Sequence, residues 1–173
     1  IGALCVLFAF LYTTGPYPLS YNGWGDVLVI IFFGFVPVGG TYYVQALTWT
    51  PDVTIASFIC GLLIDTLLVV NNYRDREADA RSGKRTVIVR FGEKFGRYFY
   101  LLLGISASLL CLYFLREGHI YAALLPQLYL VPHVLTWRRM VKIHSGKKLN
   151  SILGETSRNM LFMGILLAIG MIL

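Results

Sequence analysis

Six long runs of apolar residues constrain this chain more than any other feature of its sequence. A helix needs about 20 apolar residues to cross the roughly 30 Å hydrocarbon core of a membrane, and each run reaches or approaches that length. Of the residues, 57% are hydrophobic and only 14% are charged, which is too few polar residues to cover a water-soluble domain. We therefore predict an all-α polytopic membrane helix bundle, with residues 1–173 as a single transmembrane domain. The predicted spans are Ile1–Thr13, Asp26–Leu47, Val53–Asn72, Tyr98–Leu115, Ile120–Trp137 and Ser157–Leu173.

The first run begins inside an apolar segment. It has no initiating Met and no charged flank, so it does not look like a secretory signal, which carries a positive region before its apolar core. We expect residues 1–173 to be the later portion of a longer bundle in which several helices precede Ile1.

The distribution of basic residues predicts the orientation in the membrane. Loop 72–97 carries eight Lys or Arg residues and loop 138–148 carries five, whereas the turn between them has only Arg116 and turn 48–52 has none. Short loops rich in Lys and Arg stay in the cytoplasm. We therefore expect both basic loops, and by alternation also loop Thr13–Gly25, to lie on the cytoplasmic side.

The basic pI of about 9.3 does not indicate a nucleic-acid partner. The cations are confined to two membrane-flanking loops and are not interleaved with aromatic stacking residues in a soluble domain. Anionic membrane lipids or a phosphorylated substrate are the better partners.

The most informative polar segment is Asn71–Gly92. Asn71, Asp75 and Asp79 recur at every fourth residue, so on a helix each is turned by about 40° from the last and raised by about 6 Å. Like charges at this spacing repel unless a cation lies between them, and Mg²⁺ takes carboxylate oxygens and bridges to phosphates. We predict Asp75 and Asp79 as catalytic metal ligands with Mg²⁺ as cofactor. The alternative is a solvated helix end whose acids pair with neighbouring arginines.

Residues that suit a diphosphate surround this face. Gly83 marks a flexible turn that is followed at once by two cations, and basic side chains grip phosphate oxygens while a metal stabilises the leaving group. Glu77 points away from the face, where we expect an ordinary ion pair with Arg81. The predicted substrate-binding residues here are Asn71, Asn72, Lys84, Arg85 and Arg90.

Asp65 is an ionisable residue inside an apolar span, where such residues usually face the interior of a bundle. It precedes Asn72 by seven residues, so it lies on nearly the same helix face, about 10 Å deeper. We predict that it contributes to the substrate cavity. The alternative is a packing role, with its carboxyl group bonded to Thr66, Gln45 or a backbone group.

The segment YTTGPYPLSYNGWGD, Tyr12–Asp26, combines prolines, glycines and tyrosines in one loop. It is predicted either as an active-site loop in which Tyr12 and Tyr21 reach the substrate, or as an interfacial aromatic belt with turn residues.

Three segments resemble the UbiA superfamily of intramembrane aromatic prenyltransferases, most closely its 1,4-dihydroxy-2-naphthoate branch. They are YTTGPYPLSY, FFGFVPVGGTYYVQ (Phe32–Gln45) and NNYRDREADARSGKRTVIVRFG. The resemblance implies a nine-helix bundle with two aspartate-rich motifs, each binding Mg²⁺ that holds the diphosphate of a polyprenyl donor. Asp75 and Asp79 match the second motif, and the first is expected upstream of Ile1. Many members have a lysine in the loop that contains Tyr12 and Tyr21; this chain has none there.

The resemblance further implies a function. We expect transfer of a polyprenyl group from polyprenyl diphosphate to 1,4-dihydroxy-2-naphthoate, with loss of CO₂, in menaquinone biosynthesis at the cytoplasmic face of a bacterial inner membrane. Residues 1–173 alone are expected to be inactive, and the prenyl tail is expected to find room at Gly34, Gly39 and Gly40. Other acceptors stay open, namely 4-hydroxybenzoate, a porphyrin side chain or a tocopherol-type head group, as does a transporter or a non-catalytic lipid-binding protein.

Overall fold

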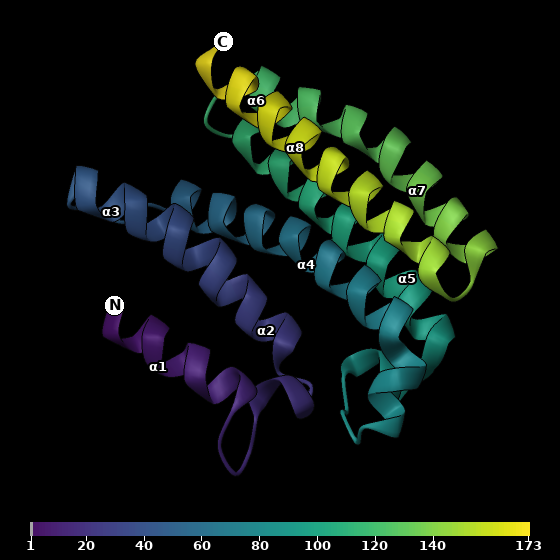
Figure 1. The fold of residues 1–173 in the computed structure, drawn as a ribbon. Helices are drawn as coiled ribbons and strands as arrows, with labels where there is room; N and C mark the ends of the chain where they lie inside the picture. Colours follow the sequence, from purple (N-terminus) through teal and green to yellow (C-terminus); the bar gives the residue numbers. More distant parts are fainter. Residues whose placement is uncertain (1) are drawn as a thin grey trace.

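The computed structural model describes residues 2–173, which form six helical rods with no strand in that range (Figure 1). The all-α prediction is therefore confirmed. A short helical turn, η1 (Leu19–Tyr21), interrupts the first connection. The rods are α1 (Gly2–Thr13); α2 (Gly25–Val29) with η2 (Ile30–Gly39) and α3 (Gly40–Ala46); α4 (Pro51–Arg81); α5 (Val87–Leu110) with η3 (Cys111–Leu115); α6 (Ile120–Leu124) with η4 (Leu125–Tyr129) and α7 (Leu130–Ile143); and η5 (Lys147–Leu149) with α8 (Asn150–Ile172).

Four of the rods in residues 2–173 are long and apolar enough to cross a membrane: Gly25–Ala46, Pro51–Arg81, Val87–Leu115 and Lys147–Ile172. The chain is thus a polytopic helical membrane protein. Two of the six predicted spans fall short of this description. The α1 rod is apolar but has only 12 residues, and the α6–α7 rod contains Gln127, His133 and two prolines, which lower its apolarity.

Helix α4 lies at the centre of the fold and packs against the α2–η2–α3 rod, α5 and α8. Its buried face belongs to two hydrophobic clusters. One contains Ile59 and Leu63 together with residues of η3, α6 and α8, and the other contains Val69, Val70 and Tyr73 together with residues of α5, α7 and α8. Burial along its whole length fixes the rotation of α4, and therefore which of its polar residues can reach a site.

Small residues allow α4 and η2 to approach closely. A Cβ atom added at Gly34 would lie 2.4 Å from the Ser57 carbonyl oxygen and 2.9 Å from the Gly61 Cα, and one at Gly39 would meet the Trp49 ring. Close backbone approach through small residues is typical of membrane helix pairs. The expectation that these glycines leave room for a prenyl tail is therefore wrong for Gly34 and Gly39, whose space is filled by the neighbouring helix and by Trp49. Of these three glycines, Gly40 alone has open space around the position of an added Cβ atom.

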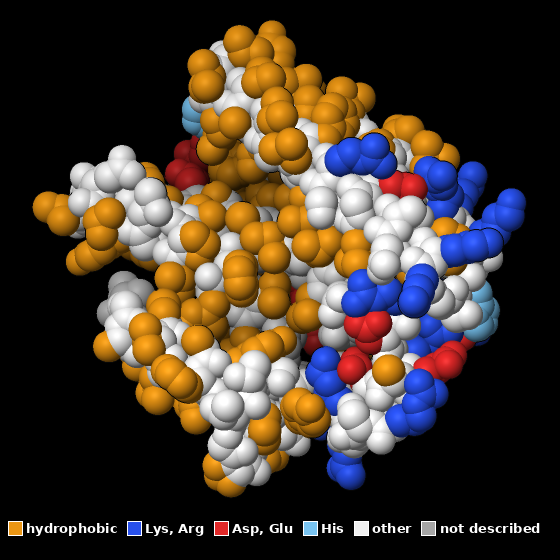
Figure 2. Space-filling model, in the orientation of Figure 1, with side chains coloured by type: hydrophobic (Ala, Val, Ile, Leu, Met, Phe, Trp, Pro, Cys, Tyr) orange, Lys and Arg blue, Asp and Glu red, His pale blue; other side chains and the backbone are white. Residues whose placement is uncertain are grey.

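The α4 helix is longer than a membrane requires. It begins with Pro51 after Thr50, whose side-chain oxygen accepts a hydrogen bond from the Val53 N–H, and it continues for 31 residues. At 1.5 Å per residue it spans about 46 Å, so about three turns extend past a 30 Å hydrocarbon core. Figure 2 shows the Lys and Arg side chains gathered at one end of the molecule, the end at which α4 passes to α5 and α7 to α8, with hydrophobic side chains over much of the remainder.

Candidate functional site

The candidate site lies on the polar extension of α4, which is helical from Pro51 to Arg81. Because the helix is continuous, Asn71, Asp75 and Asp79 share one face as the spacing predicts. The side chain of Asp79 is 13% exposed and that of Asp75 is 37% exposed, whereas Glu77 on another face is 69% exposed. Within residues 2–173 no three His, Cys, Asp or Glu side chains cluster in a way that could hold a metal. The chain therefore offers two carboxylates and an amide oxygen rather than a complete protein cage.

Arg74 binds the oxygen atoms of two of these residues. Its Nε donates to Asp75 Oδ1 over 2.7 Å, and its Nη2 donates to Asp75 Oδ2 over 2.6 Å and to Asn71 Oδ1 over 2.8 Å. Its Nη1 donates to Asn150 Oδ1, at the start of α8, over 2.9 Å. These hydrogen bonds hold the pKa of the Asp75 carboxyl below its usual range, so Asp75 is ionised at neutral pH. The predicted alternative, a carboxylate paired with a neighbouring arginine, is thus the arrangement that Asp75 adopts here.

The turn after α4 brings Lys84 to Asp79. The Gly83 N–H donates to the Ala80 carbonyl, the Lys84 N–H donates to the Asp79 carbonyl over 2.9 Å, and Gly83 has a φ of +77°. This is the Schellman pattern of helix termination, in which a left-handed residue, usually glycine, reverses the chain. It places Lys84 Nζ 3.4 Å from Asp79 Oδ2. Sequence spacing alone indicates the cations after the turn, and the turn geometry selects Lys84 as the one that contacts the acidic face.

The loop between α1 and α2 docks onto the start of α5. The Arg85 N–H donates to the Tyr21 carbonyl over 2.7 Å, and Arg90 Nη2 donates to the Asn22 carbonyl over 2.8 Å. This loop therefore lies on the same side as the basic loop 72–97, although it contains no Lys or Arg itself. Arg90 holds the loop, the Arg85 side chain is exposed, and Tyr21 is 42% exposed.

A small polar cavity lies beneath this loop, with about 10 Å³ of free space, which is enough for about one water molecule. It joins three predicted site residues, Tyr12, Asn72 and Lys84, and adds Asp26. Asp26 is not among the residues that the sequence singles out, because an acid in the first turn of a helix is an ordinary stabilising residue. The remaining lining residues are Ser20, Gly23, Gly25 and Thr86.

Asp65 is completely buried in the middle of α4, and neither of its carboxylate oxygens has a hydrogen-bond partner within residues 2–173. The alternative packing role assigned its carboxyl group to Thr66, Gln45 or a backbone group, none of which bonds to it. That alternative is wrong, because the Thr66 hydroxyl donates to the Leu63 carbonyl and the Gln45 amide donates to the Thr41 carbonyl.

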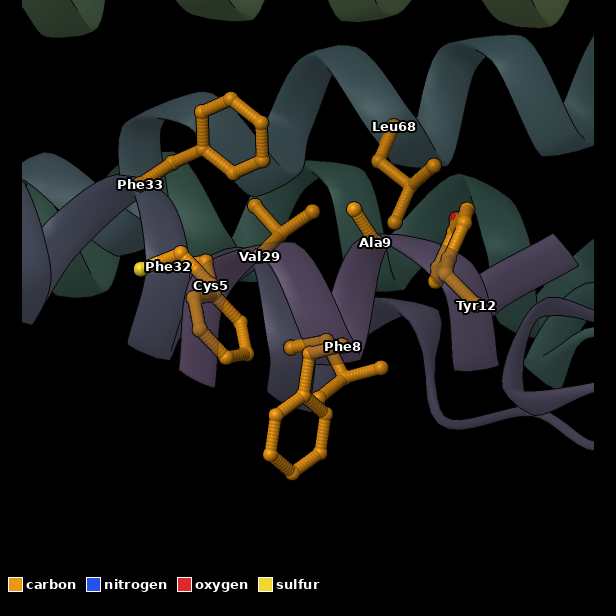
Figure 3. A pocket seen from close by; sticks show the side chains of 9 residues that line it. Cys5, Phe8, Ala9, Tyr12, Val29, Phe32, Phe33 and Leu68 are labelled. Carbon is orange, nitrogen blue, oxygen red and sulfur yellow. The ribbon is translucent and has the colours of Figure 1, made fainter. Parts of the chain in front are cut away.

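An apolar pocket of about 520 Å³ lies between α1, the α2–η2 rod and α4. Figure 3 shows its lining side chains, with Tyr12 at one end near Leu68. Tyr12 lines both this pocket and the small polar cavity, so one side chain separates an apolar space from a polar one. The pocket is lined by Cys5, Phe8, Ala9, Tyr12, Leu28, Val29, Phe32, Phe33 and Leu68.

A second polar cluster fixes the opposite face of the α4 extension. The Tyr73 hydroxyl donates to Glu93 Oε1 over 3.0 Å, and Glu93 also contacts Arg76, Arg97 and His144. The contacts of Glu93 with Tyr73, Arg76 and His144 tie α4 to α5 and to the end of α7, and local spacing does not indicate them. The Glu93–Arg97 pair lies within α5 at i,i+4 spacing. The predicted Glu77–Arg81 pair is wrong, because the salt bridge of Glu77 is a long contact with Arg76, at 4.0 Å.

Comparison with known proteins identifies the family. The UbiA prenyltransferase family model matches residues 1–172. A 1,4-dihydroxy-2-naphthoate octaprenyltransferase of Escherichia coli (strain K12) is 40% identical over 112 residues, which cover 65% of this chain and 36% of that protein. A protein with the same description from Mycobacterium leprae (strain TN) is 41% identical over 112 residues, 64% of this chain and 37% of that protein.

A more distant relative covers the whole chain. The UbiA prenyltransferase domain-containing protein 1 of Dictyostelium discoideum is 29% identical over 178 residues, 100% of this chain and 51% of that protein. No solved structure matches the chain. The helical bundle with its polar extension matches a family of membrane-embedded proteins, and the chain belongs to the UbiA prenyltransferase family. It spans little more than a third of the length of the bacterial relatives that it matches.

Proposed function

We propose that the protein transfers a polyprenyl group from polyprenyl diphosphate to 1,4-dihydroxy-2-naphthoate in menaquinone biosynthesis. The observation that carries the proposal is the face of Asn71, Asp75 and Asp79, with Lys84 turned back onto it, in a chain of this family. The names of the bacterial relatives support the acceptor and the prenyl donor. The same relatives favour a bacterial inner membrane, and the basic loops around the site favour its cytoplasmic face.

The donor set of this face suits Mg²⁺. Asp75 and Asn71 already direct three oxygen atoms at one cationic group, the Arg74 guanidinium, and hard oxygen ligands are what Mg²⁺ prefers. We propose that Asn71, Asp75 and Asp79 hold the ion and that substrate phosphates and water complete its coordination. Bound Mg²⁺ would neutralise the diphosphate and stabilise it as a leaving group.

The chain's own residues perform the remaining tasks. Lys84 lies between the acidic face and the small polar cavity, so its ammonium group can contact the diphosphate from the cavity side, and the exposed Arg85 can reach its outer oxygens. The apolar pocket beside Tyr12 excludes water from an allylic carbon. Cleavage of the allylic carbon–oxygen bond then leaves a cation that the electron-rich ring attacks, and in the naphthoate reaction the ring carboxylate leaves as CO₂.

The proposal is tested by turnover of the protein in its full natural length with polyprenyl diphosphate and 1,4-dihydroxy-2-naphthoate. Asp75→Asn and Asp79→Asn should each lower turnover by about 10²-fold or more, because each removes charge from the group that stabilises the leaving group. Glu77→Gln lies between them on the exposed face and is the matched control, which should keep nearly full activity.

Turnover with 4-hydroxybenzoate but not with the naphthoate would change the acceptor and keep the reaction class. Lipid binding without turnover on any hydroxylated aromatic compound would favour a non-catalytic lipid-binding protein. Equal damage from Glu77→Gln and Asp79→Asn would contradict the assignment of the face.

A further inference from the structure

Two acids outside the metal-binding face have no partner that explains their burial. Asp65 is completely buried and Asp26 is 7% exposed. Both oxygens of Asp65 and the Oδ1 of Asp26 lack a hydrogen-bond partner among the described residues. The ion pairs within residues 2–173 all involve other carboxylates. Three carboxylate oxygens are therefore buried without a hydrogen bond or an ion pair among the described residues. Lys84, which pairs with Asp79, lines the same cavity as Asp26.

The two acids and Tyr12 converge from three helices. The position of a Cβ atom at Gly25, the residue before Asp26, lies 3.5 Å from the Tyr12 hydroxyl and 3.3 Å from Leu68 Cδ2. Leu68 follows Asp65 by one helical turn, so it marks the same side of α4.

An unpaired carboxylate is costly to bury, and two neighbouring carboxylates resist being ionised together. The pair is therefore expected to retain a proton, which leaves one carboxylic acid that donates and one carboxylate that accepts. A hydroxyl group satisfies both, because it accepts one hydrogen bond and donates another. A phosphate does not, because like charge would face the carboxylate.

The surrounding space specifies what carries that hydroxyl group. The polar cavity beside Asp26 has room for about one water molecule, so it fits a hydroxyl group and excludes a ring. Tyr12 links it to the apolar pocket, which Phe8 and Phe32 line with aromatic rings (Figure 3). A flat aromatic ring in the pocket can direct its hydroxyl group past Tyr12 toward the acids. A prenyl chain has no polar group that could form hydrogen bonds with the two acids.

We propose that Asp26, Asp65 and Tyr12 form the site for the hydroxyl group of an aromatic acceptor, and that the carboxylate of the acid pair takes the proton of that hydroxyl. This inference rests on the proposed prenyl transfer. It assigns Asp26 and Asp65 to the acceptor, distinct from the face of Asp75 and Asp79 that would serve the diphosphate.

The allylic carbon–oxygen bond breaks and its electron pair leaves with the diphosphate, while a ring carbon forms the new carbon–carbon bond. The hydroxyl O–H bond breaks, its electron pair forms a ring carbonyl, and the proton passes to the carboxylate. The ring regains aromaticity when the alkylated carbon loses its original substituent, as a proton or as CO₂, and leaves the bonding electron pair in the ring. The carbonyl oxygen then takes the proton back from the carboxylic acid, which restores the hydroxyl group and the carboxylate.

The test uses the protein in its full natural length with 1-naphthol as the probe, titrated in the absence of a prenyl donor. Asp26→Asn and Asp65→Asn should each weaken 1-naphthol binding by about tenfold, the loss of one charge-assisted hydrogen bond. They should leave binding of 1-methoxynaphthalene, which has no O–H group, unchanged. Glu117→Gln, an exposed acid in the turn before α6, is the control and should bind both compounds like the wild type.

Turnover supplies a second readout. Asp26→Asn should raise KM for the acceptor and lower kcat, with KM for polyprenyl diphosphate unchanged. Should either Asn variant not fold, Tyr12→Phe keeps the ring and removes only the hydroxyl, and it should weaken 1-naphthol binding in the same direction. The inference would be overturned if the wild type did not bind 1-naphthol, or if all variants bound it as tightly as the wild type. If Asp26→Asn left KM and kcat for the acceptor unchanged while Asp75→Asn was inactive, the inference would be overturned and the proposed function would stand.

Discussion

At the proposed Mg²⁺ site, Arg74 binds the oxygen atoms that the ion would need, so its removal should strengthen Mg²⁺ binding. Its guanidinium contacts both oxygens of Asp75 and the Oδ1 of Asn71 within 2.8 Å. The side chains of Arg74 and Asp75 are 24% and 37% exposed, so solvent screens the pair, and its net value is about 1 kcal/mol rather than the larger value of a buried pair. In a variant without Arg74, Mg²⁺ has no guanidinium group to displace. It should therefore bind about fivefold more tightly than in the wild type.

Calorimetric titration of Mg²⁺ into Arg74→Gln and wild-type protein, both in nanodiscs, measures this difference. Arg81→Gln removes a cation from the same helix without removing an ion pair within residues 2–173, so it reports the general effect of charge and should change the dissociation constant by less. In an Asp75→Asn background the gain from Arg74→Gln should disappear, because the two residues act on each other. A dissociation constant in Arg74→Gln equal to or above that of the wild type would refute the reasoning, as would an equal gain from Arg81→Gln.

Three further predictions concern the turn, the second polar cluster and the orientation. Gly83→Ala should destabilise the protein by about 1 kcal/mol and weaken diphosphate binding, because a residue with a Cβ atom resists a φ of +77° and Lys84 would shift. Gly154→Ala, near the start of α8 with open space around it, should be neutral or stabilising in the same thermal-unfolding assay. Glu93→Gln should lower the free energy of unfolding by about 1 to 3 kcal/mol, because it removes the charged partner of a nearly buried arginine, whereas Glu117→Gln should change it little. In a cysteine-free background, Ser82→Cys should be labelled only from the cytoplasm and Glu117→Cys only from outside; labelling of position 82 from outside alone would reverse the orientation.

The parts of the site that lie on one continuous helix could be predicted from the sequence. The face of Asn71, Asp75 and Asp79 follows from the helical repeat, and Gly83 followed by Lys84 indicates the turn that brings a cation back to it. The burial of Asp65 follows from its position in an apolar run. In each case the interacting residues are within a few turns of one another.

Contacts between distant segments could not be predicted in this way. Arg74 reaches Asn150, 76 residues further along the chain, and Asp26 meets Tyr12 and Asn72 only after three helices have packed together. The glycines of η2 illustrate the same limit. Their small size is visible in the sequence, but whether it serves a ligand or a neighbouring helix depends on the packing of Gly34 against α4.

The central claim is that Asp75 and Asp79 hold Mg²⁺ for a diphosphate, and one binding measurement tests it most directly. A non-hydrolysable polyprenyl diphosphate is titrated into the protein in its full natural length with Mg²⁺ and with a chelator, and neutral polyprenol is titrated in parallel. The account predicts tight diphosphate binding only with Mg²⁺, its loss in Asp75→Asn and Asp79→Asn but not in Glu77→Gln, and no effect of Mg²⁺ on polyprenol. Diphosphate binding of equal strength in the presence of chelator would contradict it.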